Sequence, residues 1–383
     1  MVPTNDQEEK VAMRRIRRDM RRPRLAPLAL ACLAAAVPGI AAQELPTPSP
    51  QHAEKDYRRL RLFRFEFDND QLLGEDNSFT AGWSIQIHSR LNDVWKPKWI
   101  GRVPGLSDGG SGGRVTRWAF GVSQAILTPD DITIAEPQPD DAPWAGILGL
   151  SASWSAYDNR RMGALQLYLG CMGPCSGAEE VQTFVHEDLG AGDTPQGWDN
   201  QLVNQALANV NYEYRYKLHA AAPERYFIPG RFTQDVSVGS QAAVGNLRTA
   251  IQAQIEYRFG WGLPMGFAKT PDPPGWGVML DPIYADPVAP LPSRARAFRL
   301  YFTLMARVAQ TWYQAPAEGG ETVNGGYHPE LRPYPGENEL ITGMHLSRLP
   351  LALHLTYYDY FDEDQDVIKG SSDWINVSFE YRY

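Results

Sequence analysis

Hydrophobic and polar residues alternate one by one along most of the chain after residue 60, for example over residues 165–170 and 251–259. A period of two places successive side chains on opposite faces of a β-strand, so each such stretch has one apolar and one polar face. The pattern predicts twelve strands. They lie near residues 61–69, 79–90, 115–127, 144–157, 162–172, 201–217, 226–240, 246–260, 297–313, 340–349, 351–361 and 373–383.

The length and number of these strands favour a membrane protein. Most of them reach about ten residues, which is enough to cross a bilayer when the strand is tilted. The last strand alternates apolar or aromatic residues with polar ones and ends on Tyr383, as expected for a closing strand with a lipid-facing side. We therefore predict an all-β fold, a twelve-stranded antiparallel transmembrane β-barrel. The alternative is a soluble β-sandwich, in which strands are usually shorter.

One short helix is expected in the loop after the strand at 162–172. Ser176 and Glu179 have the spacing of a capping box, and Gly190 suits a left-handed C-terminal cap. The apolar residues of this helix are expected to pack against the protein; they are Val181, Phe184, Val185 and Leu189. Glu179, Gln182 and His186 share another face, which is either part of a site or a solvated surface.

The first 60 residues are not expected to belong to the barrel. Residues 1–42 combine a cluster of arginines, a short apolar stretch and the small residues Ala41 and Ala42, which is the pattern of a secretory signal peptide. Residues 43–60 are Pro-rich and then charged, and we interpret them as a linker. The barrel is accordingly predicted over residues 61–383.

Charge and cysteine content narrow the function after export. Residues 1–42 hold eight Lys/Arg and four Asp/Glu, so the remaining chain has 28 basic and 41 acidic residues and a formal charge of −13. This acidity argues against nucleic acid as a partner. Cys171 and Cys175 are then the only cysteines, and they either pair in an oxidising compartment or remain free thiols.

The predicted topology brings several polar segments to one end of the barrel. If the chain starts on the periplasmic side, the loop after the first strand and the helix near His186 both face outward. The first loop is rich in carboxylate and amide oxygens, which Ca²⁺ prefers, although a solvated polar loop has the same composition. Its oxygen-bearing residues are Asp68, Asn69, Asp70, Glu75, Asp76 and Asn77. The Pro- and Gly-rich segment 261–296 falls at the other end and is unusually long for a turn.

Several short motifs follow one another in a specific order. They are DND at 68–70, DNSFTAG at 76–82, TPDD at 128–131, DDAPWAG at 140–146, GCMGP at 170–174, EVQ at 180–182 followed by His186, and GWDNQ at 197–201. In order and spacing they resemble the motifs of the outer-membrane lipid A 3′-O-deacylase family, whose members are twelve-stranded barrels. The resemblance covers about residues 61–383 and is densest in the first half.

This resemblance implies a carboxylic ester hydrolase that removes a 3′-acyloxyacyl chain from lipid A. It implies that His186 is the catalytic base, with Asn69, Asp70, Thr80 and Gln182 beside it, and that Asp70 and Asn69 hold a Ca²⁺ ion. Such a set suits the reaction, because ester hydrolysis needs a base with a pKa near neutral and positive charge at the developing oxyanion.

Two departures from the family pattern keep other functions open. Gly192 stands where the family has a glutamate, and the loop 128–143 lacks any basic residue that could bind a lipid A phosphate. The alternatives are a phospholipase with the same His/Ca²⁺ chemistry, and a non-catalytic barrel, either a small channel or an inactive relative. In each case we expect a monomer embedded in the bacterial outer membrane, and for the deacylase we expect lipid A or lipopolysaccharide of the outer leaflet as the substrate.

Overall fold

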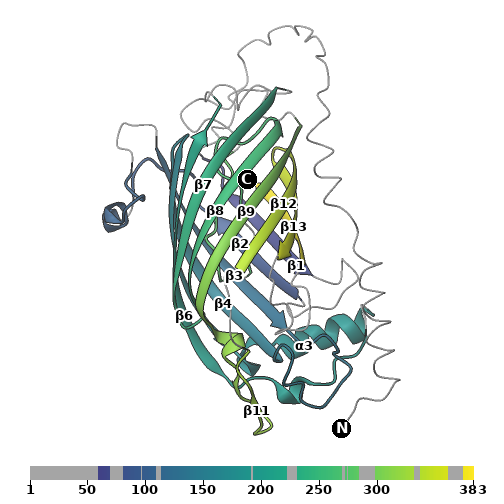
Figure 1. Ribbon diagram of the computed structural model, residues 1–383. Helices are drawn as coiled ribbons and strands as arrows, with labels where there is room; N and C mark the ends of the chain where they lie inside the picture. The colour runs from purple at the N-terminus through teal and green to yellow at the C-terminus, as the bar shows by residue number, and fades with distance from the viewer. Residues whose placement is uncertain are drawn as a thin grey trace. The chain divides into compact units, whose positions relative to one another are not determined.

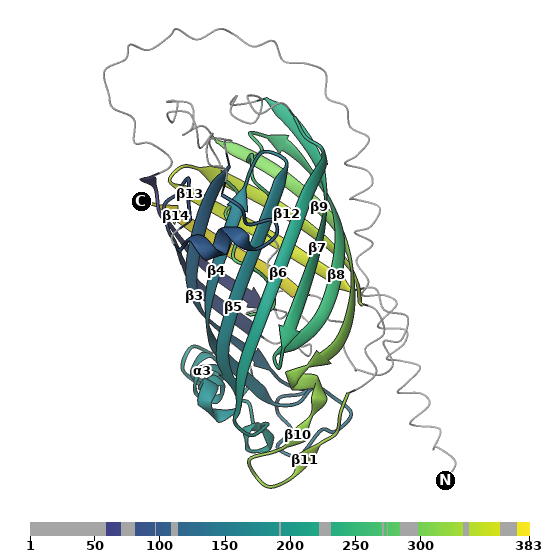
Figure 2. The same ribbon diagram turned by 90° about the vertical axis from the view of Figure 1, so that its left-hand side faces the viewer.

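The computed structural model describes residues 59–69, 81–95, 97–108, 114–190, 193–221, 231–269, 272–273, 275–283, 298–331, 337–360 and 374–383. Twelve antiparallel strands form a closed barrel, in which β1 pairs with both β2 and β14 (Figures 1 and 2). The predicted fold is confirmed. The predicted signal peptide and most of the linker lie outside the described residues.

Each predicted strand has a counterpart in the barrel. The strands are β1 (Leu62–Asn69), β2 (Ala81–His88), β3 (Val115–Leu127), β4 (Ala145–Tyr157), β5 (Arg161–Met172), β6 (Gln205–His219), β7 (Phe232–Gly245), β8 (Arg248–Trp261), β9 (Arg299–Gln314), β12 (Glu337–Arg348), β13 (Leu351–Tyr360) and β14 (Trp374–Arg382). The predicted bounds 226–240 for β7 were wrong, since the strand continues to Gly245 and includes residues 241–245, which lie between two predicted strands. Its last residues are mostly small, so hydrophobicity does not mark them as a strand.

The two faces of the wall differ as expected for a barrel in lipid. On β1, Arg64, Glu66 and Asp68 are buried and face the lumen, whereas Phe65 and Phe67 are exposed on the outer face. A polar interior and an apolar exterior are typical of outer-membrane barrels. Among the described residues, no helix is long and apolar enough to cross a membrane.

The long connection between β8 and β9 folds back into the barrel. Its described residues, 262–269, 272–273 and 275–283, are here called the plug. Leu263, Phe267 and Leu280 of the plug are buried in one apolar cluster with Tyr157 of β4 and Tyr301 of β9. This connection is unusually long for a turn because it fills part of the lumen.

Ion pairs tie the plug to the inner wall. The Asp281 carboxylate of the plug pairs with Arg117 and Arg382, and the Asp272 carboxylate pairs with Arg307. In addition, Gln166 Nε2 of β5 donates a hydrogen bond to the carbonyl oxygen of Gly277. Because buried charges are costly unless they are paired, these contacts fix the plug at defined positions on several strands.

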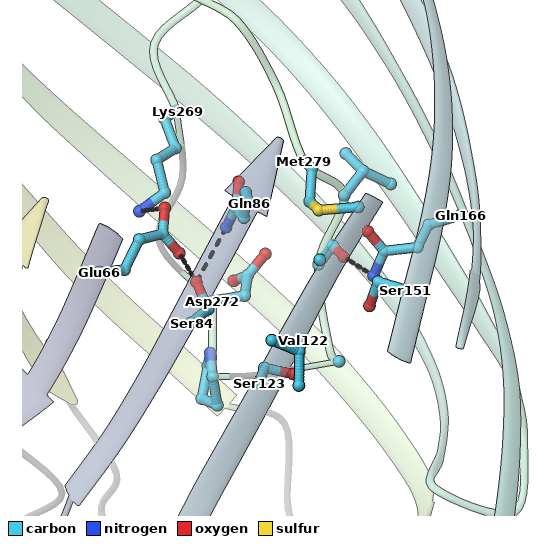
Figure 3. A pocket seen from close by; sticks show the side chains of 15 residues that line it. Glu66, Ser84, Gln86, Val122, Ser123, Ser151, Gln166, Lys269, Asp272 and Met279 are labelled. Carbon is cyan, nitrogen blue, oxygen red and sulfur yellow. Dashed lines mark hydrogen bonds and ion pairs between the residues drawn. The ribbon is translucent and has the colours of Figure 1, made fainter. Parts of the chain in front are cut away.

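A small cavity of about 40 Å³ remains between the plug and the wall (Figure 3). Lys269 of the plug pairs there with Glu66 of β1. Burial lowers the pKa of the Lys269 ammonium, and the Glu66 carboxylate opposes this shift. The cavity can hold a few water molecules but no lipid chain, so a lipid site must lie elsewhere.

The end of the barrel opposite residues 59 and 383 carries two loops with secondary structure of their own. The loop after β5 contains η4 (Pro174–Ser176), α3 (Ala178–Thr183), the π-turn η5 (Phe184–Asp188) and η6 (Trp198–Asn200). The loop after β9 contains η9 (Ala315–Glu318) and a small hairpin of β10 (Gly320–Glu321) and β11 (Tyr327–His328). Figures 1 and 2 show α3 beside the barrel at this end.

Candidate active site

Helix α3 begins directly on the barrel wall. A Cβ atom at Gly146 of β4 would overlap with Ser176 and with the Cβ of Ala178, so a glycine is required for the helix to approach this closely. Gly146 is the last residue of the motif at 140–146, and the need for a glycine there has a local reason: a side chain would prevent the helix from packing on the wall.

The start of the helix differs from the predicted capping box, which was wrong. Gly177, in the left-handed conformation with a φ of 65°, is the N-cap. Ser176 Oγ donates to the carbonyl oxygen of Gly173 at 2.6 Å and accepts from the N–H of Ala178 at 3.3 Å. Glu179 instead accepts from Gln201 Nε2 at 3.0 Å. The predicted left-handed cap is confirmed, since Gly190 has a φ of 67°.

The helix buries its polar face. Gln182 and His186 are only 3% and 6% exposed, whereas Phe184 and Leu189 are 52% and 65% exposed. The expected packing of Phe184 and Leu189 was therefore wrong, and of the apolar set Val181 packs against the buried cluster that includes Trp198. The reason is that the surrounding loop supplies hydrogen-bond partners to the polar face, which hydrophobic spacing along one helix cannot reveal.

These partners come from the loop that returns from the helix to β6. His186 Nδ1 lies 2.7 Å from the carbonyl oxygen of Asp193. A carbonyl only accepts, so Nδ1 carries the proton and Nε2 of the neutral ring keeps its lone pair. Trp198 Nε1 donates to Gln182 Oε1 at 2.8 Å. Gln182 Nε2 is buried and has no hydrogen-bond partner among the described residues. One face of the helix thus presents a base and an N–H donor one turn apart.

The wall beneath the helix start is also organised by hydrogen bonds. Trp83 Nε1 of β2 donates to Gln124 Oε1 of β3 at 2.8 Å, and Gln124 Nε2 donates to the carbonyl oxygen of Ser176 at 2.7 Å. Gln124 lies on the outward-facing side of β3, between the exposed Phe120 and the helix. The candidate site is therefore on the outside of the barrel, separate from the lumen.

The predicted site residues are only partly described. Asp70, Thr80 and Gly192 lie outside the described residues. Asn69 is the last residue of β1 and faces outward. Across the wall its row of paired residues continues through Ala81 of β2 and Ile126 of β3 to Gly146 of β4, where α3 begins. Three strand spacings of this kind amount to roughly 14 Å. Asn69, Gln182 and His186 thus share one outer wall at one end of the barrel.

Known proteins with a similar sequence or fold identify the family of this chain. A family model described as outer membrane protein LpxR matches residues 28–336. The chain belongs to the LpxR family. Of the solved structures, LpxR from Salmonella typhimurium is similar with a TM-score of 0.62 and 14% identity, over 84% of this chain and 99% of that one. This confirms the family predicted from the motifs and the outer-membrane location.

Two further solved barrels are similar at lower scores. The β domain of the Bordetella autotransporter BrkA has a TM-score of 0.38 and 10% identity, over 85% of this chain and 98% of that one. The COG4313 outer-membrane channel from Pseudomonas putida F1 has a TM-score of 0.37 and 9% identity, over 88% of this chain and 100% of that one. Neither supports an argument about this LpxR family member. Among curated protein sequences, none matches the chain significantly.

Cys171 and Cys175 form a disulfide at the outer end of β5. Of the two alternatives left open by the sequence, pairing is thus the one observed. The N–H of Cys175 also donates to Asn204 Oδ1 at 2.7 Å. The disulfide closes the turn through Gly173 that leads into η4, so it helps to define where the helix of this LpxR family member begins.

Two residues important for the site were missed in the sequence. Trp198 was noted only as part of the motif at 197–201, and Gln124 was not noted at all. Their roles depend on contacts across a loop and between strands, although the motif around Trp198 was a usable signal. The described residues contain no group of three His, Cys, Asp or Glu side chains arranged to hold a metal ion. Of the predicted Ca²⁺ ligands, Asn69 is described and offers the amide oxygen that suits a hard cation.

Proposed function

We propose that this LpxR family member is an outer-membrane lipid A deacylase that hydrolyses the ester of a 3′-acyloxyacyl chain, with His186 as general base. The observation that carries the proposal is the hydrogen bond from His186 Nδ1 to the carbonyl oxygen of Asp193. This bond holds the ring in the tautomer that leaves Nε2 available to accept a proton. Family membership supports the substrate class.

The proposed reaction uses groups that lie on one helix face. His186 Nε2 takes a proton from water, and the oxygen of that water attacks the ester carbonyl carbon. The buried N–H donor of Gln182 is available to the carbonyl oxygen as negative charge develops there. The tetrahedral intermediate then expels the alcohol, which takes the proton from His186. Asn69 and Asp70 would hold Ca²⁺, which when bound supplies further positive charge at that oxygen.

The position of the site supports a membrane lipid as substrate. The site lies on the outer wall, at the end of the barrel opposite residues 59 and 383. With β1 starting on the periplasmic side, as predicted from the sequence, this end of the barrel faces outward. A lipid of the outer leaflet can therefore reach His186 from the side while its chains stay in the bilayer. The plug, which fills much of the lumen, makes the small channel the weaker alternative.

The phospholipase remains the second candidate because the loop 128–143 contains no Lys or Arg. A bisphosphorylated substrate such as lipid A would favour basic residues near the site. The same base and donor could act on a phospholipid ester. The two functions differ only in the lipid that is cleaved, so both lipids must be offered in the same assay.

The experiment compares the chain with His186→Ala, using release of fatty acid from purified lipid A and from phospholipid vesicles, with masses of the products. We expect lipid A to lose one ester-linked chain, and the variant to be slower by about 10²–10⁴-fold. His219→Ala is the control, since His219 is exposed at the other end of β6. Full activity of His186→Ala would disprove the assigned base, and cleavage of phospholipid alone would favour the phospholipase.

A further inference from the structure

The connection between β2 and β3 lies on the outside of the barrel wall. Its described residues, 91–95 and 97–108, are here called the outer strap, and they include the 3₁₀-helix η3 (Lys98–Arg102). Figures 1 and 2 both show this dark blue turn outside the wall, and in Figure 2 it lies across β4 and β5. The strap belongs to the end of the barrel at which residues 59 and 383 lie.

The outer strap is fastened to the lipid-facing surface by its inner side. Trp95, Ile100 and Leu106 are buried in one cluster with Ala156 of β4, and the outward-facing Trp154 and Leu165 pack against that cluster. These wall residues belong to the same outward-facing series as Leu150 and Leu167, which remain exposed.

Polar and backbone contacts continue this attachment along the next strand. Tyr212 Oη of β6 donates to the carbonyl oxygen of Pro104 at 2.9 Å. A Cβ atom at Gly163 would overlap with the carbonyl of Gly105, so the strap touches the strand backbone there. The strap is therefore a fixed part of the outer surface.

The other side of the outer strap is aromatic and basic. Trp99 is 51% exposed, with its ring centroid 6.3 Å from that of Trp154. Lys98 and Arg102 flank it in the same turn and are exposed. A Trp between two basic residues is the combination that proteins place at the membrane–water interface. This side of the strap therefore differs from the uncharged apolar surface of the neighbouring strands.

The backbone of the strap limits the depth at which it can lie. Irregular backbone exposed to lipid is not tolerated in the hydrocarbon region, because its polar groups would lack hydrogen-bond partners. At the level of the headgroups, phosphates and water can satisfy these groups. Tyr212 and Tyr214, which contact Gly105, are residues typical of the interfacial aromatic girdle.

We propose that the outer strap is a binding surface for anionic glycerophospholipid headgroups of the periplasmic leaflet, with Trp99 at the interface and Lys98 and Arg102 on the phosphates. Continuity with the lipid-facing wall and the basic charge of the turn, in a chain with a formal charge of −9, support this partner. The proposal is independent of the enzymatic function, since the strap and the helix α3 lie at opposite ends of the barrel.

The test uses the full chain in phosphatidylcholine vesicles, and subtracts the fluorescence of Trp99→Phe to isolate Trp99. Three quenchers are compared: phosphatidylcholine with a headgroup nitroxide, phosphatidylcholine with a nitroxide deep in the chain, and aqueous iodide. We expect the headgroup nitroxide to quench Trp99 most strongly. Stronger quenching by iodide would show that the strap faces water, and stronger quenching by the deep nitroxide would place it in hydrocarbon; either result overturns the proposal.

Competition then tests the preference for anionic lipid. Adding unlabelled phosphatidylglycerol should displace the labelled lipid and reduce the quenching of Trp99 by about twofold or more. Lys98→Gln/Arg102→Gln should abolish this effect, whereas Arg231→Gln/Arg348→Gln, at exposed positions of the same end away from the strap, should keep it. An equal effect of phosphatidylglycerol on both double variants would overturn the assignment to Lys98 and Arg102. Heat-modifiable gel mobility confirms folding of each variant.

Discussion

Trp198 donates its indole N–H to Gln182 Oε1 at 2.8 Å, and this contact determines which end of the Gln182 amide is left free. With Oε1 engaged, Nε2 is the atom without a partner among the described residues, and it lies one helical turn from His186. If the Gln182 amide were turned over, its Nε2 donor would face the Trp198 Nε1 donor, and no hydrogen bond could form. Trp198 is therefore a positioning residue for a donor in the proposed reaction.

Replacing Trp198 with phenylalanine should lower lipid hydrolysis by roughly 2- to 10-fold, the worth of one hydrogen bond. The fall should be in kcat more than in KM, because the donor acts on the developing oxyanion. Trp144→Phe is a matched control. Trp144 packs edge-on against Trp198, with ring centroids 5.0 Å apart, but its own Nε1 has no hydrogen-bond partner within the described part of the chain. Equal losses in both variants would show that only aromatic packing matters.

Removal of Ca²⁺ should stop the reaction and leave the barrel folded. The first loop concentrates the hard oxygen ligands that this ion prefers, and Asn69 lies on the outer wall shared with His186. Hydrolysis is measured in a chelator and after Ca²⁺ is returned. Asn69→Ala should raise the Ca²⁺ concentration required by roughly 10-fold or more. Unchanged turnover in the chelator would contradict the metal assignment.

The disulfide should matter for the site more than for the barrel. Cys171→Ser/Cys175→Ser opens a five-residue loop, for which the loss of stability is about 2 kcal/mol. We expect a several-fold loss of hydrolysis and faster proteolysis between 173 and 190, because the disulfide fixes the entry to the helix. Wild-type protein treated with a reductant should behave in the same way. No change in either measurement would show that the turn holds without it.

The barrel was predictable because each strand has its own alternation of apolar and polar residues, which can be recognised without knowing its neighbours. The position of Asn69 and His186 at one end also followed from the order of the strands. The face that α3 buries did not, since Phe184 and Leu189 lie at helical spacing from Val181 and Val185 and yet remain exposed. That choice depends on Asp193 and Trp198, which belong to a different part of the loop. Local patterns cannot reveal such contacts.

The plug was unpredictable for the same reason on a larger scale. Asp281 has its partners Arg117 on β3 and Arg382 on β14, far away in the sequence on both sides. A Pro- and Gly-rich segment gives no periodic signal, so only its excess length was visible. Its burial depends on a lumen that exists only once all twelve strands have closed.

Replacing residues 264–282 with a short Gly-Ser linker should turn the closed barrel into an ion-conducting pore. The inner wall would then lose the buried apolar cluster around Phe267 and expose Arg117 and Arg307 to water. Conductance in planar bilayers is the measurement, and the wild-type chain should show none. Asp281→Asn is the intermediate case. It keeps the plug but removes the carboxylate charge that Arg117 and Arg382 share, while Arg382 retains Glu380. We expect a loss of about 3–5 kcal/mol and therefore brief openings.

The outcome separates two ways of closing the lumen. If the plug closes it, the deletion variant conducts steadily while its gel mobility still reports a folded barrel. If a folded deletion variant does not conduct, the strands' own side chains close the lumen, and the plug serves stability alone. Lipid hydrolysis by the same variant adds an independent check, because His186 and Gln182 lie outside the wall and form hydrogen bonds with Asp193 and Trp198 of their own loop. We therefore expect hydrolysis to persist in a barrel that has become a pore.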